Sequence, residues 1–479
     1  MAEYEPVIGL EIHVHLQTRT KMFCGCELSF GDEPNVHTCP VCLAHPGVLP
    51  VTNERAIRYA LMIAAALGCK VAPRSIFHRK NYFYPDNPKA YQISQYDIPL
   101  ATGGRLGDVR IHRVHLEEDA AKMIHVGESG RIHGSGASLV DFNRAGTPLV
   151  EIVTEPDLRS ACEVRAWAQL LQTTVRQLGV SDVQMEEGSL RVDGNVSLRP
   201  AGSEELGIKT ELKNMNSFKF LERGIEAEIE RQRGLLEASE AVIQETLHFD
   251  PGSGSLTPLR SKEYEHDYRY FPEPDLVPLA PTEEMLREAT EALPELPAER
   301  DERYRKELDL SPEVATLLAA EPKSADLFEQ VAAQVARRDI PAQVVANWVT
   351  GEVAAALRRR DDGSDASNVA PDLLAQLIGM VNSKQLSHTV AKGILPAIIF
   401  EGRDPEQLVE EQGLGQIGGG EELEGVVEAA IEAEPEAAEQ VREGNQKAIG
   451  RIVGAVMKET KGRADGGEVQ RLIHDKLGV

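Results

Sequence analysis

The sequence predicts a multidomain α+β protein, with an N-terminal domain built on an antiparallel sheet and an all-α region that ends in a small helical tail domain. Three observations predict this organisation. A chain of 479 residues exceeds what one hydrophobic core usually supports. Strand-like and helix-like segments are mixed in the first part of the chain, and beyond it Ala, Leu, Glu and Gln recur with helical spacing. We therefore expect domains at 1–292, 293–403 and 404–479.

The first domain alternates between strands and helices. Strict alternation of apolar and polar side chains indicates half-buried strands, and apolar residues at helical spacing indicate amphipathic helices. The two patterns predict strands at 7–16 and 109–116 and helices at 54–67 and 161–178. Runs of Gly and Ser predict loops at 127–138 and 250–255.

A proline-rich stretch at 271–281 marks the approach to the end of the first domain, and the chain beyond it is predicted to be almost entirely helical. Within the helical part, RRRDDGSDASNVAP at 358–371 predicts an exposed loop. The segment QIGGGEELEG at 416–425 predicts a glycine hinge between helices. The helices after this hinge form the predicted tail domain.

The net charge of −26 limits the functions that the chain can serve. Non-specific nucleic-acid binding depends on Lys and Arg neutralising phosphates, so this charge excludes a general nucleic-acid coat, and any nucleic-acid contact must be local. Excess carboxylate can instead hold divalent metal ions. No segment approaches the roughly 20 apolar residues that cross a bilayer, and the N-terminus lacks the features of a signal peptide. We expect a cytoplasmic protein without a membrane partner.

Four of the six cysteines lie close together in the sequence. Cys24 and Cys26 form a first pair, and Cys39 and Cys42 form a second. Two such pairs, each beside turn residues, have the spacing by which two loops supply four thiolates to a tetrahedral zinc. A closed four-sulfur site has no open coordination position, so this zinc would be structural. Reduced thiols without a metal are the alternative.

The segment GLEIHVHLQT at 9–18 places Glu11, His13 and His15 on the polar face of a predicted strand. Side chains two positions apart on one face lie roughly 7 Å from each other, so Glu11 and His13 can serve one metal cluster. Further acids lie in other strand-like segments: Glu117, Glu118, Asp119, Glu151, Glu155, Glu186, Glu187, Asp193 and Glu211. Any one of them is more often a solvated residue than a ligand, but several on one sheet face can converge on a metal.

Basic and aromatic residues are concentrated in FHRKNYFYPDNPKAYQISQYDIP at 77–99. Arg79, Lys80 and Lys89 can meet phosphates. The tyrosines that can stack on a base or ribose are Tyr82, Tyr84, Tyr91 and Tyr96. A surface hairpin with aromatic side chains filling the core beneath it is an equal alternative. The sequence has no G-x-x-x-x-G-K-[ST], no G-x-G-x-x-G after a strand and no G-x-S-x-G, so neither a familiar glycine cradle for a nucleotide nor an acyl-hydrolysing centre is expected.

Several long motifs resemble one known family. In chain order they are VIGLEIHV, RKNYFYPDNPKAYQISQYDIP, HLEEDAAK, SLVDFNRAGTPLVEIVTEPD, SDVQMEEGSLRVDGNVSLRP, ELKNMNSF and YRYFPEPDLVPL. In their order and separation these motifs resemble the B subunit of the glutamyl/aspartyl-tRNA amidotransferase, and the resemblance covers essentially the whole chain. The segment KAIGRIVGAVMKETKGRAD resembles the YqeY-type helical domain that ends this B subunit.

The resemblance implies a ligase that forms carbon–nitrogen bonds with glutamine as the amido donor. In this family the B subunit works in a heterotrimer with an amidase (glutaminase) A subunit and a small C subunit. It uses ATP and Mg²⁺ to phosphorylate the side-chain carboxylate of glutamate or aspartate misacylated onto tRNA, and ammonia from the amidase then displaces the phosphate. The expected partners are these two subunits and misacylated tRNA, with an aminoacyl-tRNA synthetase considered as a further one.

The resemblance also implies roles for particular residues. The expected magnesium shell is Glu11, His13, Glu118, Asp193 and Glu211, with Glu151 as a catalytic neighbour. The residues expected to contact ATP are Arg79, Lys80, Tyr82, Lys89 and Tyr91. The tail is expected to contact tRNA through Lys447, Arg451, Lys458, Lys461 and Arg463, for which ordinary charge balance on a surface helix is the alternative. The family suggests no role for His15, and only part of it has the four cysteines, so the zinc prediction rests on their spacing.

Two other functions are compatible with parts of the sequence. A zinc-bearing RNA-binding protein without catalysis would explain the cysteines and the basic tail, but it leaves Glu11, Glu118 and Asp193 without a purpose. A stand-alone ATP-dependent amide ligase acting on a small carboxylic acid is the third possibility. The sequence does not decide whether Glu-tRNA(Gln), Asp-tRNA(Asn) or both are the substrate, because both use the same chemistry.

Overall fold

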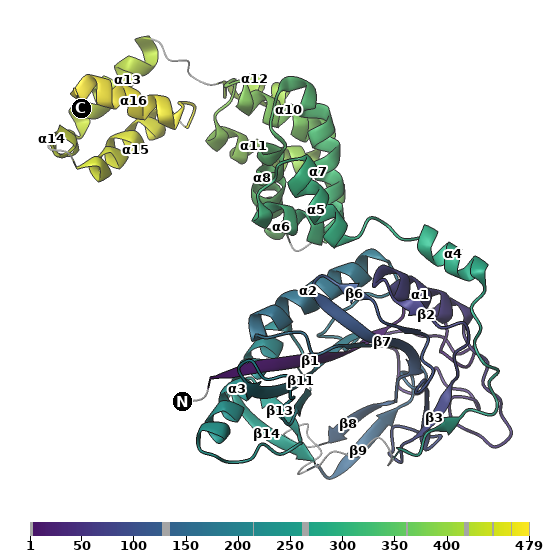
Figure 1. The fold of residues 1–479 in the computed structure, drawn as a ribbon. Helices are drawn as coiled ribbons and strands as arrows, with labels where there is room; N and C mark the ends of the chain where they lie inside the picture. Colours follow the sequence, from purple (N-terminus) through teal and green to yellow (C-terminus); the bar gives the residue numbers. More distant parts are fainter. Residues whose placement is uncertain are drawn as a thin grey trace. The chain divides into compact units, whose positions relative to one another are not determined.

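A ten-stranded sheet is the scaffold of the first of two compact units, 1–298 and 299–479, into which the computed structural model divides (Figure 1). The strand order is β14-β13-β12-β11-β1-β10-β7-β5-β2, with β6 paired to β7. Neighbouring strands are antiparallel, except that β12 and β13 are parallel. The structure describes residues 3–126, 135–213, 215–260, 268–360, 363–415, 421–442, 445–460 and 462–478.

Three sheets account for the strands of this unit. The ten-stranded sheet contains β1 (Tyr4–His15), β2 (Lys70–Val71), β5 (Ala101–Thr102), β6 (Arg105–Leu106), β7 (Val109–Glu118), β10 (Pro148–Thr154), β11 (Leu190–Pro200), β12 (Thr210–Lys213), β13 (Thr246–Asp250) and β14 (Ser255–Arg260). A three-stranded sheet contains β15 (Phe271–Pro272), β3 (His78–Asn81) and β4 (Tyr91–Ser94). A separate hairpin contains β8 (Lys122–Val126) and β9 (Ala137–Asp141). The strands predicted at 7–16 and 109–116 are confirmed as β1 and β7.

Three long helices cover one face of the ten-stranded sheet (Figure 1). They are α1 (Glu54–Ala66), α2 (Ala161–Gln177) and α3 (Phe218–Glu237). Each follows a residue whose side chain accepts a hydrogen bond from a first-turn backbone N–H: Asn53, Ser160 and Ser217 respectively. A shorter helix, α4 (Glu283–Glu291), packs against α1. The predicted helices at 54–67 and 161–178 are confirmed as α1 and α2.

The strand β1 separates the hydrophobic core from a polar face. Leu10, Ile12 and Val14 are buried in the core that the sheet shares with the helices. Because successive side chains of a strand point to opposite faces, Glu11 and His13 lie on the other side of the sheet. The core therefore occupies only one face, and the opposite face carries polar groups.

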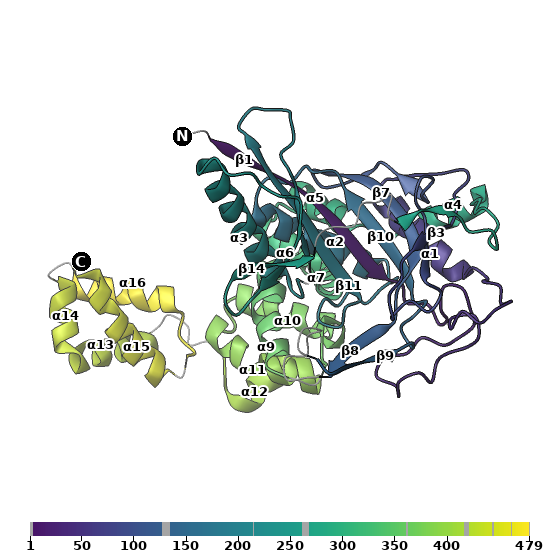
Figure 2. The same ribbon diagram turned by 90° about the horizontal axis from the view of Figure 1, so that it is seen from below.

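Residues 299–479 are helical, and no strand occurs among the described residues of this unit (Figures 1 and 2). Its α-helices are α5 (Pro297–Glu307), α6 (Pro312–Ala320), α7 (Pro322–Val335), α8 (Ala342–Asn347), α9 (Ala354–Arg358), α10 (Pro371–Asn382), α11 (His388–Glu401), α12 (Pro405–Gln412), α13 (Glu421–Ala433), α14 (Pro435–Arg442), α15 (Ile449–Glu459) and α16 (Gly466–Leu477). Between them lie the 3-10 helices η2 (Ala336–Arg338), η4 (Ala366–Asn368) and η5 (Gln446–Ala448) and the π-helix η3 (Trp348–Val353). One buried cluster runs from Tyr304 to Leu408 and a second from Leu423 to Leu477. The prediction of a helical second half is confirmed, and a domain boundary at residue 403 stays a prediction.

The structure agrees with some of the predicted loops and differs from others. The segment 250–255 forms the turn between β13 and β14 as expected, whereas the loop at 358–371 contains η4. The expected hinge at 416–425 is wrong in its second half, because α13 begins at Glu421; residues 416–420 lie outside the described chain, as do 127–134 of the predicted loop 127–138. Across the described ranges, we find no helix with the length and apolar character that a membrane span requires.

Candidate functional site

Five neighbouring strands of the large sheet place acidic and basic side chains in one row on its polar face. Cross-strand pairing sets Glu11 opposite Asp193, His13 opposite Glu151, and Glu151 opposite His115. Directly opposite residues of antiparallel strands point to the same face. The register thus brings His13 and Glu11 together with acids that are more than 100 residues away in the sequence.

His13 lies at the centre of this row. Its Nε2 atom is 3.4 Å from Glu151 Oε2, 3.6 Å from Glu11 Oε1 and 3.7 Å from Glu117 Oε1. Glu117 also accepts a hydrogen bond from the Ser94 hydroxyl at 3.0 Å. Three carboxylates therefore surround one imidazole at distances longer than a good hydrogen bond.

The charges of this row change its ionisation. Burial by itself would lower the pKa of His13, but the side-chain contact with Glu151 and the charges of Glu151, Glu117 and Glu11 raise it to about 9. Burial would raise the pKa of Glu151, yet His115 and His13 hold it well below its usual range. In contrast, burial and the charge of Glu151 raise the pKa of Glu11. A metal ion would have to displace a proton from His13, because only neutral imidazole is a ligand.

Two overlapping sets of side chains in this row can hold a cation. Glu11, His13 and Asp193 form one set, and His13, Glu117 and Glu151 form the other. Within each set the candidate ligand atoms all lie within 4.8 Å of one another. Carboxylate oxygens with one imidazole suit Mg²⁺ or Mn²⁺ rather than a thiophilic metal. The donor chemistry therefore fits the divalent ion that a nucleotide needs.

Glu211, a predicted metal ligand, lies at the end of the row and is separated from it by a lysine. Lys213 Nζ is 3.3 Å from Asp193 and 3.4 Å from Glu211. The Thr246 hydroxyl donates to Glu211 at 2.9 Å. Burial would lower the pKa of Lys213, but the charges of Asp193 and Glu211 raise it. Glu211 is therefore on the expected face but pairs with Lys213 instead of joining either ligand set.

Glu118, another predicted metal ligand, is not brought to the His13 cluster, and its role as a ligand stays a prediction. Its carboxylate is ion-paired with Lys89 and accepts from the backbone N–H of Ile93 at 3.0 Å. The strand β7 alternates, so Glu117 shares the face of His13 and Glu118 points to the opposite side with Leu116. The missed residue is Glu117, and the period-two pattern of VRIHRVHLEE was the signal that could have found it.

His15, for which no role was expected, lies at the edge of the cluster. Its Nε2 is 2.7 Å from Asp119 Oδ2, and Arg191 donates to the same oxygen at 3.0 Å. Although burial would raise the pKa of Asp119, the charges of Arg191 and Arg144 with the His15 contact hold it well below its usual range. His15 thus helps to fix Asp119 beside the row.

A cavity of 610 Å³ lies against this polar face. Its lining includes Glu11, His13 and Asp193 together with the cations Lys80, Arg191 and Lys213. Burial would lower the pKa of Lys80, but neighbouring Tyr270 and the charges of Glu117 and Glu151 raise it. A cavity with cations and a candidate metal cluster on its wall can receive a substrate that carries phosphates and a carboxylate.

The residues predicted to contact ATP are divided between two cavities by strand alternation. Lys80 and Tyr82 line the 610 Å³ cavity. Arg79, Lys89 and Tyr91 instead line a second cavity of 280 Å³. The guanidinium of Arg79 donates two hydrogen bonds to the Glu273 carboxylate, at 2.7 and 2.8 Å. Only Lys80 and Tyr82 are therefore placed beside the His13 cluster.

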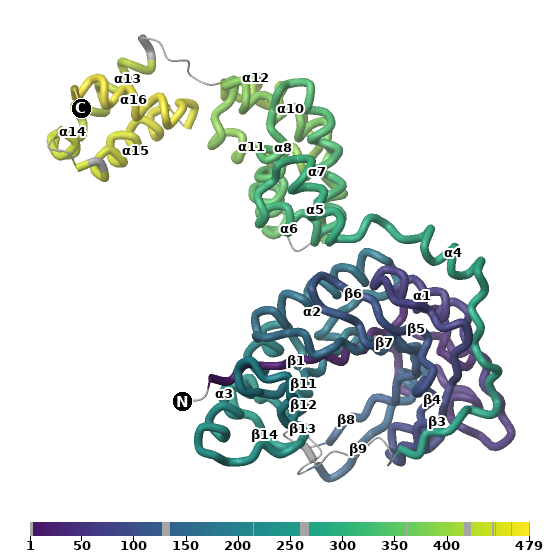
Figure 3. The backbone as a smooth tube through the Cα atoms, viewed as in Figure 1, coloured from purple at the N-terminus to yellow at the C-terminus, as the bar shows by residue number. Residues whose placement is uncertain are grey.

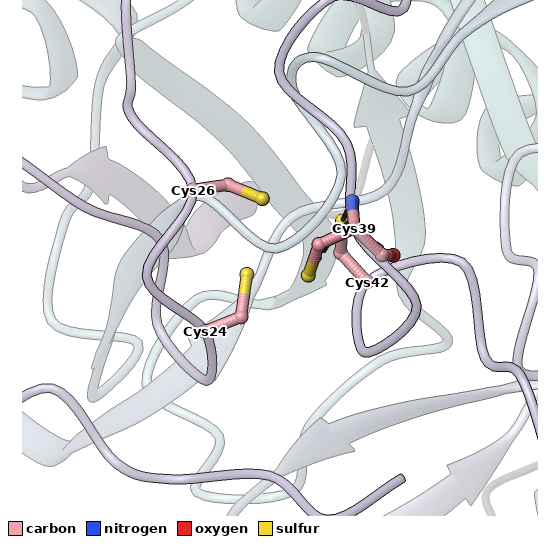
Figure 4. Close-up of side chains that lie close together, drawn as sticks. All are labelled: Cys24, Cys26, Cys39 and Cys42. Atoms are coloured by element: carbon pink, nitrogen blue, oxygen red, sulfur yellow. Dashed lines mark hydrogen bonds between the residues drawn. The ribbon is translucent and has the colours of Figure 1, made fainter.

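The four cysteines of the predicted zinc site lie together on two loops (Figure 4). Their sulfur atoms all lie within 4.8 Å of one another, and Cys39 Sγ and Cys42 Sγ are 3.9 Å apart. Tetrahedral zinc with Zn–S bonds of about 2.3 Å would place sulfurs about 3.8 Å apart. The geometry and the donor set therefore fit zinc.

A buried lysine lies beside this cysteine cluster. Lys21 is fully buried, its Nζ donates to the Phe142 carbonyl at 2.9 Å, and Cys42 Sγ is 3.6 Å away. The hydrogen bond from the Cys24 thiol outweighs burial and, with the backbone N–H of Cys39 and the charge of Lys21, lowers the pKa of Cys42 to about 4. A thiolate that forms readily is the state that zinc requires.

Three of the five basic residues predicted to contact tRNA are exposed to solvent. Lys447, Arg451 and Lys458 are exposed, and the last two lie seven residues apart, on one stripe of α15. Arg463 donates to the carbonyls of Thr460 and Gly413, and Lys461 lies outside the described residues.

Comparison with known proteins adds independent information. Residues 6–287 match the family described as the GatB/GatE catalytic domain, and residues 326–477 match the one described as the GatB domain. A protein of Thermus thermophilus, named as the B subunit of aspartyl/glutamyl-tRNA(Asn/Gln) amidotransferase, is 49% identical over 481 residues, which cover 99% of this chain and 100% of that one. Proteins of the same name from Geobacter sulfurreducens and Persephonella marina are 46% and 44% identical, over 99% of this chain and 99% and 100% of theirs.

Proposed function

Because the chain belongs to the GatB family of amidotransferase subunits, we propose that it activates the side-chain carboxylate of an amino acid misacylated onto tRNA. The substrate is Glu-tRNA(Gln), Asp-tRNA(Asn) or both. ATP and Mg²⁺ are the cofactors, and the products are Gln-tRNA(Gln) and Asn-tRNA(Asn).

One observation carries this proposal: the two overlapping ligand sets around His13 on the wall of the 610 Å³ cavity. Carboxyl activation by ATP needs neutralisation of phosphate charge and in-line positioning, and little general-base help, because the attacking carboxylate is already anionic. A face that combines candidate metal ligands with Lys80 and Arg191 offers these elements together.

The proposed reaction has two steps, phosphorylation of the carboxylate and displacement of the phosphate by ammonia. A side-chain carboxylate oxygen attacks the γ-phosphorus of ATP, the bond to the β–γ bridging oxygen breaks, and ADP leaves. Ammonia then attacks the acyl carbon of the acyl phosphate, loses a proton and expels inorganic phosphate. Mg²⁺ held by the residues around His13 would offset the charge that develops on the phosphate oxygens.

The residues of this chain have separate tasks in these steps. His13 would hold the cation either with Glu117 and Glu151 or with Glu11 and Asp193. Lys80 and Arg191, which line the cavity, attract the phosphates. Lys213, between Asp193 and Glu211, keeps the two carboxylates apart from each other and limits their repulsion. Glu118, on the other face of β7, forms an ion pair with Lys89.

The proposal includes partners. The relatives are named as B subunits, which is in keeping with an assembly. We place the chain in a cytoplasmic heterotrimer with an amidase (glutaminase) A subunit, which frees ammonia from glutamine, and a small C subunit. The exposed bases Lys447, Arg451 and Lys458 contact tRNA. An aminoacyl-tRNA synthetase is a further candidate partner.

Reconstitution tests the central proposal. The chain is combined with the amidase and small subunits, ATP, Mg²⁺ and glutamine, and Glu-tRNA(Gln), Asp-tRNA(Asn) and free glutamate are offered separately. We expect amide formation on at least one aminoacyl-tRNA, with one ADP released per amide and none formed on free glutamate. Amide formation without ATP, or on free glutamate alone, would contradict the proposal and favour a stand-alone ligase.

Metal analysis tests the structural zinc that we propose at the four cysteines. We expect one zinc per purified chain, lost in Cys42→Ser, with a lower melting temperature because the two loops are then no longer joined. Cys162→Ser is the matched control, since Cys162 is exposed and outside the cluster. Equal zinc contents in the two variants would contradict a zinc site at the four cysteines.

A further inference from the structure

The β8–β9 hairpin exposes an apolar face that nothing in the proposed chemistry explains. Ile124 is 45% exposed, Val126 is 50% exposed and Leu139 is 60% exposed. The hairpin is separate from the ten-stranded sheet (Figure 3), and in chain order it lies between β7 and β10. Soluble proteins rarely expose a contiguous apolar surface of this kind without using it.

These side chains share one face of the hairpin, and that face continues the wall of the 610 Å³ cavity. Ile124 is opposite Leu139, Val126 is opposite Ala137, and Lys122 precedes them on the same face. Lys122 lines the cavity that contains the His13 cluster. The apolar face therefore extends outward from the cavity, with a cation at the junction.

An exposed aromatic side chain lies at the same junction. Phe30 is 78% exposed and lines the cavity together with Lys122. The loop that carries Phe30 is fastened to the base of the hairpin: Asn35 donates its backbone N–H to Asp141 at 3.0 Å and its side-chain amide to the Val140 carbonyl at 3.2 Å. Phe30 and the hairpin are thus held in one structural element.

We propose that this surface, defined by Phe30, Lys122, Ile124, Val126 and Leu139, binds the unpaired 3′-terminal nucleotide of the aminoacyl-tRNA. The inference rests on the proposed function, because it assumes that the aminoacyl group enters the cavity. Aromatic and aliphatic side chains hold an unpaired base by stacking and apolar contact, and a lysine meets the adjacent phosphate. Stacking tolerates any base and so suits an end that every substrate tRNA shares.

The position of the surface favours this occupant over a protein partner. The amino acid and the terminal nucleotide are joined by an ester, so the base must lie at the mouth of the cavity that receives the amino acid. Phe30 and Lys122 line that cavity and are exposed to solvent, as residues at its mouth would be. A protein seated on the same face would cover the entrance that the substrate uses. With an overall charge of −26, the chain also needs its RNA contacts to be local and partly uncharged.

Photocrosslinking in the complete reconstituted complex tests the location. The probe is aminoacyl-tRNA whose 3′-terminal adenosine carries an 8-azido group, and the crosslinked peptides are identified by mass spectrometry. We expect crosslinks to the segment 122–126, to 137–139 or to Phe30. Crosslinks confined to other segments would overturn the proposal.

Kinetics of substituted complexes test the contribution of the face. Phe30→Ala and Leu139→Asp are expected to raise KM for aminoacyl-tRNA about tenfold, while kcat changes less than about twofold, because stacking is lost and the metal cluster is untouched. Phe30→Trp should restore the wild-type KM. Val277→Asp is the matched control, since Val277 is 85% exposed and belongs to neither the hairpin nor the cavity lining.

The outcomes separate this inference from the proposed function. Unchanged KM in Phe30→Ala and Leu139→Asp overturns the nucleotide site. Loss of complex assembly in Leu139→Asp on size-exclusion chromatography, with crosslinks unaltered, identifies the face as an interface between subunits and also overturns it. If the wild-type complex forms no amide at all, the proposed function fails, whereas the crosslink position still reports on the surface.

Discussion

Two buried groups of polar side chains in residues 1–298, one around Glu228 and one around His13, differ in how their carboxylate oxygens are satisfied. Glu228 on α3 is fully buried, and both of its oxygens accept hydrogen bonds. Its donors are Thr210 at 2.7 Å, Arg231 at 2.7 and 2.9 Å, and Gln232 at 2.8 Å. We call this a closed network, because both carboxylate oxygens of Glu228 already accept hydrogen bonds from protein donors.

The cluster around His13 is built in the opposite way. Glu11, Glu117 and Glu151 crowd around one imidazole at 3.4 to 3.7 Å, and like charges face each other across the sheet. Carboxylates brought together with few donors raise the free energy of the empty site and leave lone pairs for a cation. The comparison teaches that arrangement, more than burial or residue type, distinguishes a candidate site from a structural network.

Removing one carboxylate from the open cluster should have the largest effect. In Glu117→Gln we expect ATP-dependent amide formation to fall at least about 100-fold and Mn²⁺ affinity, measured as a probe for Mg²⁺, to fall at least about tenfold. The melting temperature should fall modestly, because His115, Lys80 and His13 outweigh the repulsion from Glu151 and hold the pKa of Glu117 below its usual value, and this net attraction is lost. A large loss of stability with full metal binding would place Glu117 among the structural carboxylates.

The adjacent residue supplies the matched comparison. Glu118→Gln should destabilise the fold by about 2–3 kcal/mol, because Lys89 is then buried without its charged partner. The structure adds that Mn²⁺ affinity should be unchanged, since Glu118 faces away from His13. Titration of Mn²⁺ into both variants, with melting curves, checks the contrast.

The closed network should respond only in stability. Glu228→Gln is expected to lower the free energy of unfolding by about 1–2 kcal/mol, because Arg231 then faces an amide N–H₂ instead of a second oxygen. The activity of the folded complex should equal that of the wild type. Denaturant unfolding measures the stability, and amide formation at a temperature below both melting points measures the activity. Reduced activity of a fully folded variant would show that Glu228 is not purely structural.

A surface pair gives the smallest expected effect. Asp157 accepts from Arg110 at 2.7, 2.9 and 3.0 Å, and these hydrogen bonds lower the pKa of Asp157. The lowered pKa means that the stabilisation is present above the unfolded pKa of about 3.9 and is lost as the pH falls through the folded value. Asp157→Asn should therefore cost less than about 1 kcal/mol at pH 7, and its melting temperature should converge with that of the wild type towards about pH 3.

Much of the fold could be predicted because each element follows from local pattern. Alternation in β1 and β7, helical spacing in α1 and α2, and the change of composition after the proline-rich stretch all survive in the structure. The hinge at 416–425 was predicted too far along the chain, because two glutamates after the glycines already begin α13. Glycine lowers the stability of a helix and so indicates where one is interrupted, but it does not determine the residue at which the next helix begins.

The candidate site was harder to predict. The cysteine pairs were close in sequence, and their spacing alone indicated that they meet. Glu11, His13 and Asp193 also meet as expected. The ligands expected from the sequence included Glu118 and not Glu117. Alternation along β7 places Glu118 on the apolar face with Val114 and Leu116, and Glu117 on the opposite face. Glu211 was expected among the ligands, yet Lys213 lies between it and Asp193.

The sequence by itself determined which side chains each strand can present together, because the two-residue period of a strand depends only on local backbone geometry. It also determined the cysteine framework and the change from a mixed to a helical chain. Only the tertiary structure decided which strands are neighbours and in what register, and thus that His13 faces Glu151 and Glu117 while Glu118 faces Lys89. Register depends on contacts between distant segments, and a shift of one residue would move every side chain of a strand to the other face.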